Sequence, residues 1–207
     1  MRLAAFMMIL LSFSLPAAAA LPEARTKYAA EIAAAEKYLN TIRTLKARFI
    51  QTAPDGRQAA GTFMMRRPGR MRFDYDAPIE DFIVADGMFI HYYDGEMKQG
   101  SRTLISQSLA NFFLRKDLTL SGDLEVSDVQ RSGGMLMISL NQTDDKGAGT
   151  LVLGFAEKPA LELKKWRIVD ATGAITEVEL FETLTGLKLD KDLFHYYDPE
   201  LTKPKYN

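Results

Sequence analysis

Residues 61–99 read GTFMMRRPGRMRFDYDAPIEDFIVADGMFIHYYDGEMKQ, and this stretch decides the fold. Within it, the segment Met71–Asp76 alternates Met, Phe and Tyr with Arg and Asp. Successive side chains of a β-strand point to opposite faces of a sheet. The alternation therefore predicts a strand with one apolar and one polar face.

Two Asp-Gly pairs predict tight hairpin turns in the same stretch. Asp86-Gly87 separates Asp81–Val84 from Met88–Ile90, and Asp94-Gly95 precedes a further predicted strand at Glu96–Lys98. Glycine supplies the positive φ that a two-residue hairpin turn requires. Two proline pairs mark the other joins: Pro68-Gly69 and Ala77-Pro78. The stretch therefore predicts a meander, in which each strand pairs with its neighbour in the sequence.

The apolar residues in the rest of the chain recur with either helical or strand spacing. Apolar residues recur every three or four positions across residues 23–42, which predicts an amphipathic helix. Residues 104–118 lack alternation and predict one or two short helices. Further strands are predicted at residues 45–52, 59–66, 124–129, 135–140, 150–155, 161–169 and 175–184, with a last short strand near 194–196. Because no helix of crossover length separates the strands, the sheet is expected to be antiparallel.

The first 20 residues have the features of a secretory signal peptide. Arg2 precedes an apolar run from Leu3 to Leu15, and Ala17–Ala20 offers a cleavage site of small residues. This run is shorter than the roughly 20 apolar residues of a membrane-spanning helix. Cleavage after Ala20 would leave 207 − 20 = 187 residues, so we expect a single domain over residues 21–207.

Charge and cysteine content exclude several classes of protein. Lys and Arg number 26 against 27 Asp and Glu, a balance that lacks the basic surface needed to bind nucleic acid. The chain contains no Cys, so it forms no disulfides and offers no cysteine for N-terminal lipid anchoring. We expect a soluble protein of the periplasm.

The residues that carry catalysis in other proteins are sparse here. The chain has two His residues, His91 and His195, and neither has a second metal ligand two or four positions away, so no metal site is expected. Asp74 and Asp76 fall on the polar face of their strand and are interpreted as solvated carboxylates. A hydrolase using this acidic pair stays open as an alternative. We otherwise expect no enzyme activity and no cofactor.

One ordered set of motifs resembles a known family. Arg66–Gly69 precedes an aromatic strand, followed by Pro78, Ile83–Gly87 and Tyr93-Asp94. This order is similar to that of the periplasmic lipoprotein carrier family LolA, and a looser likeness extends from Leu39 to Pro199. The resemblance implies an α+β, mainly β fold: a curved, incomplete antiparallel β-barrel, in which an N-terminal helix and short helices form a lid over an apolar cavity.

The resemblance also implies a function. LolA proteins shield the acyl chains of lipoproteins and carry them from the inner-membrane Lol ABC transporter to the outer membrane. Each CH₂ group gains about 0.8 kcal/mol on leaving water, so acylated cargo needs such a shield. Two alternatives stay open. Delivery could use a separate LolB-type receptor at the outer membrane, or this chain could perform both steps. The protein could also carry another lipid or glycolipid. A monomer is expected.

Site residues follow from the resemblance and from the apolar pattern. Arg67, the arginine before Pro68, is expected to point into the cavity and to hydrogen-bond lid carbonyls as a latch; a register shift of one would give this role to Arg66. The lining of the acyl-chain cavity is expected to include Phe63, Met65, Met71, Phe73, Tyr75, Ile83, Phe89, Leu109 and Phe112, with Met64 beside them. Unbranched Met side chains adapt to irregular apolar partners, although they also fill ordinary cores.

Overall fold

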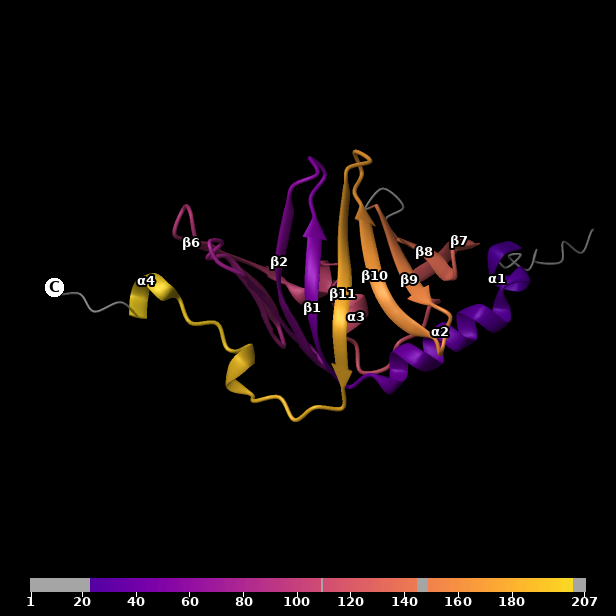
Figure 1. Ribbon diagram of the computed structural model, residues 1–207, viewed down its shortest axis with the longest axis horizontal. Helices are drawn as coiled ribbons and strands as arrows, with labels where there is room; N and C mark the ends of the chain where they lie inside the picture. Colours follow the sequence, from indigo (N-terminus) through magenta and orange to yellow (C-terminus); the bar gives the residue numbers. More distant parts are fainter. Residues whose placement is uncertain (1–22, 109, 145–148, 203–207) are drawn as a thin grey trace, which may run out of the picture.

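The computed structural model describes residues 23–108, 110–144 and 149–202, so the predicted signal peptide lies outside the described part. Within these residues a single antiparallel sheet of 11 strands curves around one side of the molecule (Figure 1). Its strands are β1 (Thr44–Thr52), β2 (Gln58–Arg66), β3 (Arg70–Tyr75), β4 (Phe82–Asp86), β5 (Phe89–Asp94), β6 (Gln99–Leu104), β7 (Leu124–Ser132), β8 (Met135–Gln142), β9 (Thr150–Ala156), β10 (Glu162–Val169) and β11 (Ile175–Thr185).

The strand order explains why the barrel is incomplete. It runs β6-β5-β4-β3-β2-β1-β11-β10-β9-β8-β7, so β1 joins two meanders by pairing with both β2 and β11. The end strands β6 and β7 do not pair with each other. The antiparallel sheet expected from the strand pattern and the open, curved barrel implied by the family resemblance are therefore confirmed.

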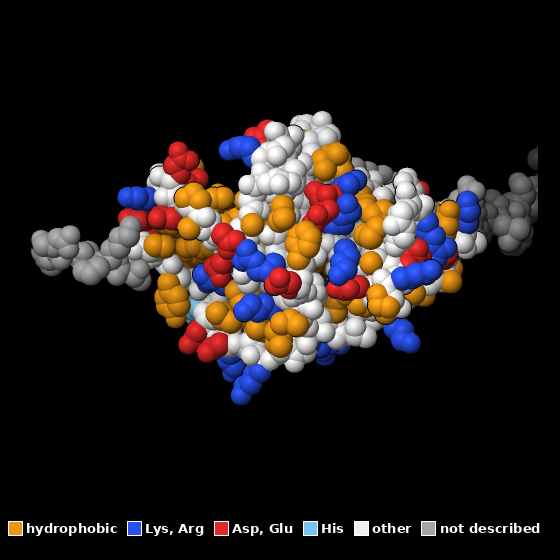
Figure 2. All heavy atoms as spheres, viewed as in Figure 1, with side chains coloured by type: hydrophobic (Ala, Val, Ile, Leu, Met, Phe, Trp, Pro, Cys, Tyr) orange, Lys and Arg blue, Asp and Glu red, His pale blue; other side chains and the backbone are white. Residues whose placement is uncertain are grey.

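Two helices precede the sheet. The predicted helix over residues 23–42 forms as α1 (Glu23–Lys27) and α2 (Ala29–Thr41), interrupted at Tyr28. The helix α2 buries Ile32, Ala35 and Leu39, whose spacing of three and four residues places them on one helical face. These side chains join the main hydrophobic core on the concave side of the sheet. The outer face of β1, β10 and β11 instead mixes basic, acidic and apolar side chains (Figure 2).

The segment between the two edge strands is helical in short pieces, as predicted. It contains the 3₁₀ helix η1 (Ile105–Gln107) and the helix α3 (Ala110–Leu114). Its apolar side chains Phe112, Leu114 and Leu118 are each 2% exposed and belong to the same core as α2. We call residues 105–108 and 110–120 the lid segment, because their apolar side chains pack into the core on the inner face of the open sheet.

Two turns differ from the prediction in detail. The predicted strand Glu96–Lys98 is wrong: these residues belong to the turn, and β6 begins at Gln99. The Asp94 carboxylate accepts a hydrogen bond from the Met97 N–H at 2.7 Å, which stabilises a turn longer than two residues. The other hairpin turn consists of Gly87 and Met88, one residue later than Asp86-Gly87.

The predicted strand at Phe194–Tyr196 is also wrong. The 3₁₀ helix η2 (Asp192–Phe194) occupies this place, followed by α4 (Pro199–Thr202). The C-terminal segment crosses the outer face of β3 and β4, where the Arg72 guanidinium donates to the Leu193 carbonyl oxygen at 3.2 Å. Phe194 is fully buried on this face and is not part of the main core on the concave side. The Arg66 guanidinium lies over its ring.

Candidate functional site

The inner face of the sheet is not completely filled. An apolar cavity of about 190 Å³ lies between the sheet and the lid segment. Its walls consist of Gln51, Phe63, Met71, Phe73, Ile83, Ser108, Phe113, Leu151, Trp166, Ile168, Thr176 and Val178. Only Gln51, Ser108 and Thr176 among these carry a polar side-chain group other than the indole N–H of Trp166. The cavity can therefore hold an apolar group by burial, which does not depend on direction.

Four of the predicted cavity residues line this space: Phe63, Met71, Phe73 and Ile83. Met65 is 3% exposed and fills the core nearby, and Tyr75 lines an adjoining hollow. Phe112 is buried in the lid segment, with its ring 5.4 Å from that of Phe113. Leu109 lies outside the described residues.

The structure corrects the expectation for Phe89 and Met64. Ala85 and Ile90 pair across β4 and β5 on the inner side, so Phe89 points to the outer face, where the Arg102 guanidinium lies 4.9 Å from its ring centroid. Met64 pairs with Arg72 and also points outward. Both residues therefore lie on the face opposite the cavity.

Sequence reasoning missed the cavity wall contributed by the second half of the chain. The Trp166 ring lies 5.6 Å from that of Phe63 and 5.3 Å from that of Phe113, so this indole joins the sheet to the lid segment. Trp166 and Ile168 alternate with charged residues in β10. This alternation could have marked them as facing inward, but it does not show which residues lie across the barrel.

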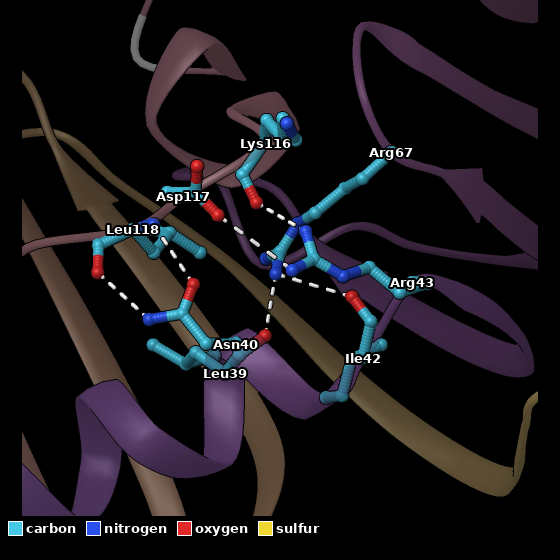
Figure 3. A network of polar contacts seen from close by, with 8 residues as sticks. All are labelled: Leu39, Asn40, Ile42, Arg43, Arg67, Lys116, Asp117 and Leu118. Atoms are coloured by element: carbon cyan, nitrogen blue, oxygen red, sulfur yellow. Dashed lines mark hydrogen bonds and ion pairs between the residues drawn. The ribbon is translucent and has the colours of Figure 1, made fainter.

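Arg67 is buried between α2 and the lid segment. Its guanidinium bonds backbone carbonyls on both sides, and Figure 3 shows those of Leu39 and Ile42. The guanidinium Nε donates to the Phe113 carbonyl oxygen at 2.5 Å. The Nη1 atom donates to the carbonyl oxygens of Leu39 and Ile42, the latter at 3.2 Å. Because these two carbonyls end α2, their partial negative charge favours a cation at this place.

Further side chains join α2 to the lid segment in the same region. The Asn40 amide donates to the Leu118 carbonyl oxygen at 2.8 Å and accepts from the Leu118 N–H at 2.9 Å (Figure 3). Arg43 donates to the Lys116 carbonyl oxygen and lies 3.6 Å from the Asp117 carboxylate. The Glu36 carboxylate accepts from the Leu120 N–H at 2.6 Å. No sequence motif identified these contacts, which join residues more than 70 positions apart.

Among the described residues, no carboxylate forms an ion pair with the Arg67 guanidinium. Burial lowers the pKa of the guanidinium from 12.5 to about 10, with a smaller contribution from the nearby charge of Arg43. Arg67 therefore remains protonated at neutral pH, and backbone carbonyls alone accept its described hydrogen bonds. Arg66 points to the outer face, where it lies 5.6 Å from the Phe194 ring centroid.

The acidic pair considered for hydrolysis lies elsewhere. The Asp74 carboxylate pairs with Arg72 at 2.7 Å, and the Asp76 carboxylate pairs with Arg48. Hydrogen bonding to Arg48 is the main cause that lowers the pKa of Asp76. Both carboxylates are thus paired with arginines and neither lines the apolar cavity, which favours the interpretation as surface ion pairs.

A curved open sheet around an apolar cavity, covered by short helices, defines the class of open half-barrel folds. The family model of the outer membrane lipoprotein carrier protein LolA matches residues 40–197. The chain therefore belongs to the LolA family. Within the described residues, no helix has the length and apolar character needed to cross a bilayer.

Individual relatives agree with this assignment. An outer-membrane lipoprotein carrier protein of Methylococcus capsulatus is 28% identical over 172 residues, covering 79% of this chain and 82% of the relative. One of Legionella pneumophila is 29% identical over 171 residues, covering 78% and 83%. A crystal structure of a DUF1329 family protein from Desulfovibrio piger shares the fold, with a TM-score of 0.50 at 10% identity over 84% of this chain and 98% of that one.

Proposed function

We propose that this protein is a periplasmic chaperone that shields the acyl chains of lipoproteins and carries them to the outer membrane. The observation that carries the proposal is the unfilled apolar cavity of about 190 Å³ beneath the lid segment. Family membership supports the choice of lipoproteins as cargo. Binding and release require only burial and exposure of apolar surface, so the proposal involves no catalysis and no cofactor.

The lid segment has to move when cargo enters. A triacyl group is larger than this cavity, whose wall on the lid side includes Phe113, with the buried Phe112 ring packed against Phe113. Acyl chains that displaced these side chains would replace one apolar contact with another. The exchange is therefore expected to cost little free energy, which suits a carrier that must also release its cargo.

Arg67 is proposed to act as the latch of the empty protein. It bonds the end of α2 on one side and Phe113 of the lid segment on the other, so opening the lid segment breaks contacts of a buried cation. A buried charge that loses its acceptors carries a large free-energy penalty. This penalty favours the closed form and thereby favours release of cargo.

The proposed route includes the partners of the family. A leader cleaved after Ala20 would export the domain of residues 21–207 as a soluble monomer of the periplasm. It would accept cargo from the inner-membrane Lol ABC transporter. Delivery would be to a LolB-type receptor at the outer membrane, or this chain would perform both steps.

Two measurements test the proposal. Depletion of the protein should cause mature lipoproteins to accumulate at the inner membrane; unchanged sorting would contradict the function. Native mass spectrometry of the purified protein after incubation with envelope extract should show the added mass of a lipoprotein. Retention of a lipid or glycolipid mass alone would identify a carrier for that class instead.

A further inference from the structure

A second hollow adjoins the apolar cavity and differs from it in chemistry. It has a volume of about 480 Å³ and shares Gln51 and Ile83 with the cavity wall. Its walls also include the polar side chains of Arg57, Gln58, Tyr75, Asp81 and Tyr92. The hollow is lined by residues beside the turn between β1 and β2, whereas the Arg67 contacts lie near the start of β1; Figure 1 shows these two ends of β1. The polar hollow therefore adjoins the apolar cavity at the end of the barrel that lies away from Arg67.

The polar groups of this hollow are held in place. The Tyr75 hydroxyl donates to the Gln51 side-chain oxygen at 2.8 Å, and the Tyr92 hydroxyl donates to the Asp81 carboxylate at 2.8 Å. Asp81 also accepts from the Gly95 N–H at 2.9 Å. The Gln51 oxygen is therefore engaged, while its amide nitrogen donates no hydrogen bond among the described residues. That N–H₂ group lies at the boundary between the apolar cavity and the polar hollow and has two protons to donate.

The charges of the hollow nearly cancel. Arg57 contributes a cation, but it already pairs with the Asp55 carboxylate at 2.6 Å. Asp81 contributes an anion whose two oxygens accept the described hydrogen bonds. A strongly anionic headgroup would find no unpaired cation here and would lie close to Asp81. Uncharged ester and amide groups match the donors and acceptors of these walls without such repulsion.

Building on the proposed carrier function, we propose that this hollow binds the uncharged polar head of the cargo. The head comprises the ester and amide linkages of an acylated cysteine and the first peptide units that follow it. Gln51 donates to a carbonyl of these linkages at the point where the acyl chains enter the apolar cavity. This contact sets how deeply the chains insert and favours lipoproteins over phospholipids with the same chains.

The test compares three probes with identical eight-carbon chains, measured by titration calorimetry on the purified protein. They are an N-acetylated cysteinyl dipeptide amide that carries an S-dioctanoylglyceryl group, dioctanoyl phosphatidylglycerol with the same two chains, and octanoate. The variant Gln51→Leu removes the donor at nearly constant volume. Thr176→Val is the matched control, because it removes a polar group from the apolar cavity wall but not from the polar hollow. Circular dichroism checks that both variants are folded.

The unaltered protein should bind the lipopeptide more tightly than the phospholipid. Gln51→Leu should weaken lipopeptide binding roughly tenfold, the effect of one hydrogen bond, and leave octanoate unchanged. Thr176→Val should change neither. Two results would overturn the proposed subsite and leave the carrier function in place. In the first, Gln51→Leu binds each probe as tightly as the unaltered protein does. In the second, Gln51→Leu weakens the binding of all three probes to the same extent. Failure of the unaltered protein to bind the lipopeptide would contradict the carrier function itself.

Discussion

Arg67 donates a hydrogen bond to the carbonyl oxygen of Phe113 across 46 positions of sequence. The bond joins the end of β2 to α3 of the lid segment, and the same guanidinium holds the last turn of α2. One buried cation therefore ties together the end of β2, the end of α2 and the lid segment. In the proposed mechanism, this tie is what the cargo must break.

Replacement of Arg67 by Leu should separate uptake from release. The variant loses three contacts of the closed form, so the open form becomes more populated and acyl chains bind at least as tightly as before. Transfer of bound lipopeptide to acceptor vesicles should become slower. The free energy of unfolding should also fall, because three backbone carbonyls lose their donor, so circular dichroism first checks that the variant is folded. Fluorescence displacement gives the affinity, and vesicle co-flotation gives the transfer rate.

Arg66→Leu is the matched control for this experiment. It removes the same type of side chain one residue earlier, on the outer face beside Phe194. Transfer by Arg66→Leu should remain close to that of the unaltered protein. If Arg67→Leu transfers at the unaltered rate, or if Arg66→Leu is the slower variant, Arg67 is not the latch.

A carboxylate placed in the cavity wall should prevent binding. Met71 is 8% exposed and lines the apolar cavity, so Met71→Glu would bring an ionisable group against the acyl chains. Burial of an unpaired charge is costly, and we expect lipopeptide affinity to fall by roughly tenfold or more. Met88→Glu makes the same change at a residue that is 64% exposed and should bind normally. Normal binding by folded Met71→Glu would place the acyl chains elsewhere.

Asn40 should hold the lid segment closed by its two bonds to the Leu118 backbone. Asn40→Ala removes both and leaves two polar backbone groups without a partner, at a cost on the order of 1–2 kcal/mol. Amide hydrogen exchange within residues 113–120 should accelerate accordingly, whereas exchange in β8 and β9 should not.

Thr41→Ala serves as the comparison for Asn40. Its hydroxyl donates to the Tyr38 carbonyl oxygen within the helix and does not reach the lid segment. Exchange in residues 113–120 should then match that of the unaltered protein. Equal acceleration by both variants would show that the end of α2, and not the Asn40 contact, controls the lid segment.

Alkaline pH should destabilise the protein through Tyr75. Burial, with the nearby Asp81 charge, raises the pKa of its hydroxyl from 10.0 to about 12. Between these values the unfolded chain has lost the proton and the folded protein retains it, so the free energy of unfolding falls as pH rises. Tyr75→Phe should make this fall less steep in urea titrations between pH 10 and 12. An unchanged slope would mean that the hydroxyl is not held neutral beside Gln51.

The sequence predicts the sheet well because strand periodicity is local. The alternation of Met71, Phe73 and Tyr75 with charged residues is enough to orient β3, and Met71 and Phe73 do line the cavity. Residue type favours Phe89 as a cavity residue, although a shift of one position reverses the face to which a strand side chain points. Phe194 has a strand-like aromatic neighbourhood, but tertiary contacts with the outer face determine its conformation.

The lid contacts are harder to predict because they are not local. A family motif identifies Arg67. Asn40, Arg43 and Glu36 instead bond to backbone atoms of the lid segment, which residues of any type would supply at those positions. Trp166 lies opposite Phe63 only because β1 joins the two meanders by pairing with β11. Such contacts depend on how the sheet curves, and no spacing in the sequence gives that curvature.

The central claim is that acyl chains enter the cavity beneath the lid segment, and Trp166 allows a direct measurement. It is the single Trp of the chain, it is 7% exposed, and it lies in the cavity wall. Bromine atoms quench indole fluorescence only at close range. A lipopeptide with brominated acyl chains should therefore quench Trp166 in a saturable manner, and an unbrominated lipopeptide should reverse the quenching. Binding of the brominated lipopeptide without quenching would contradict the account.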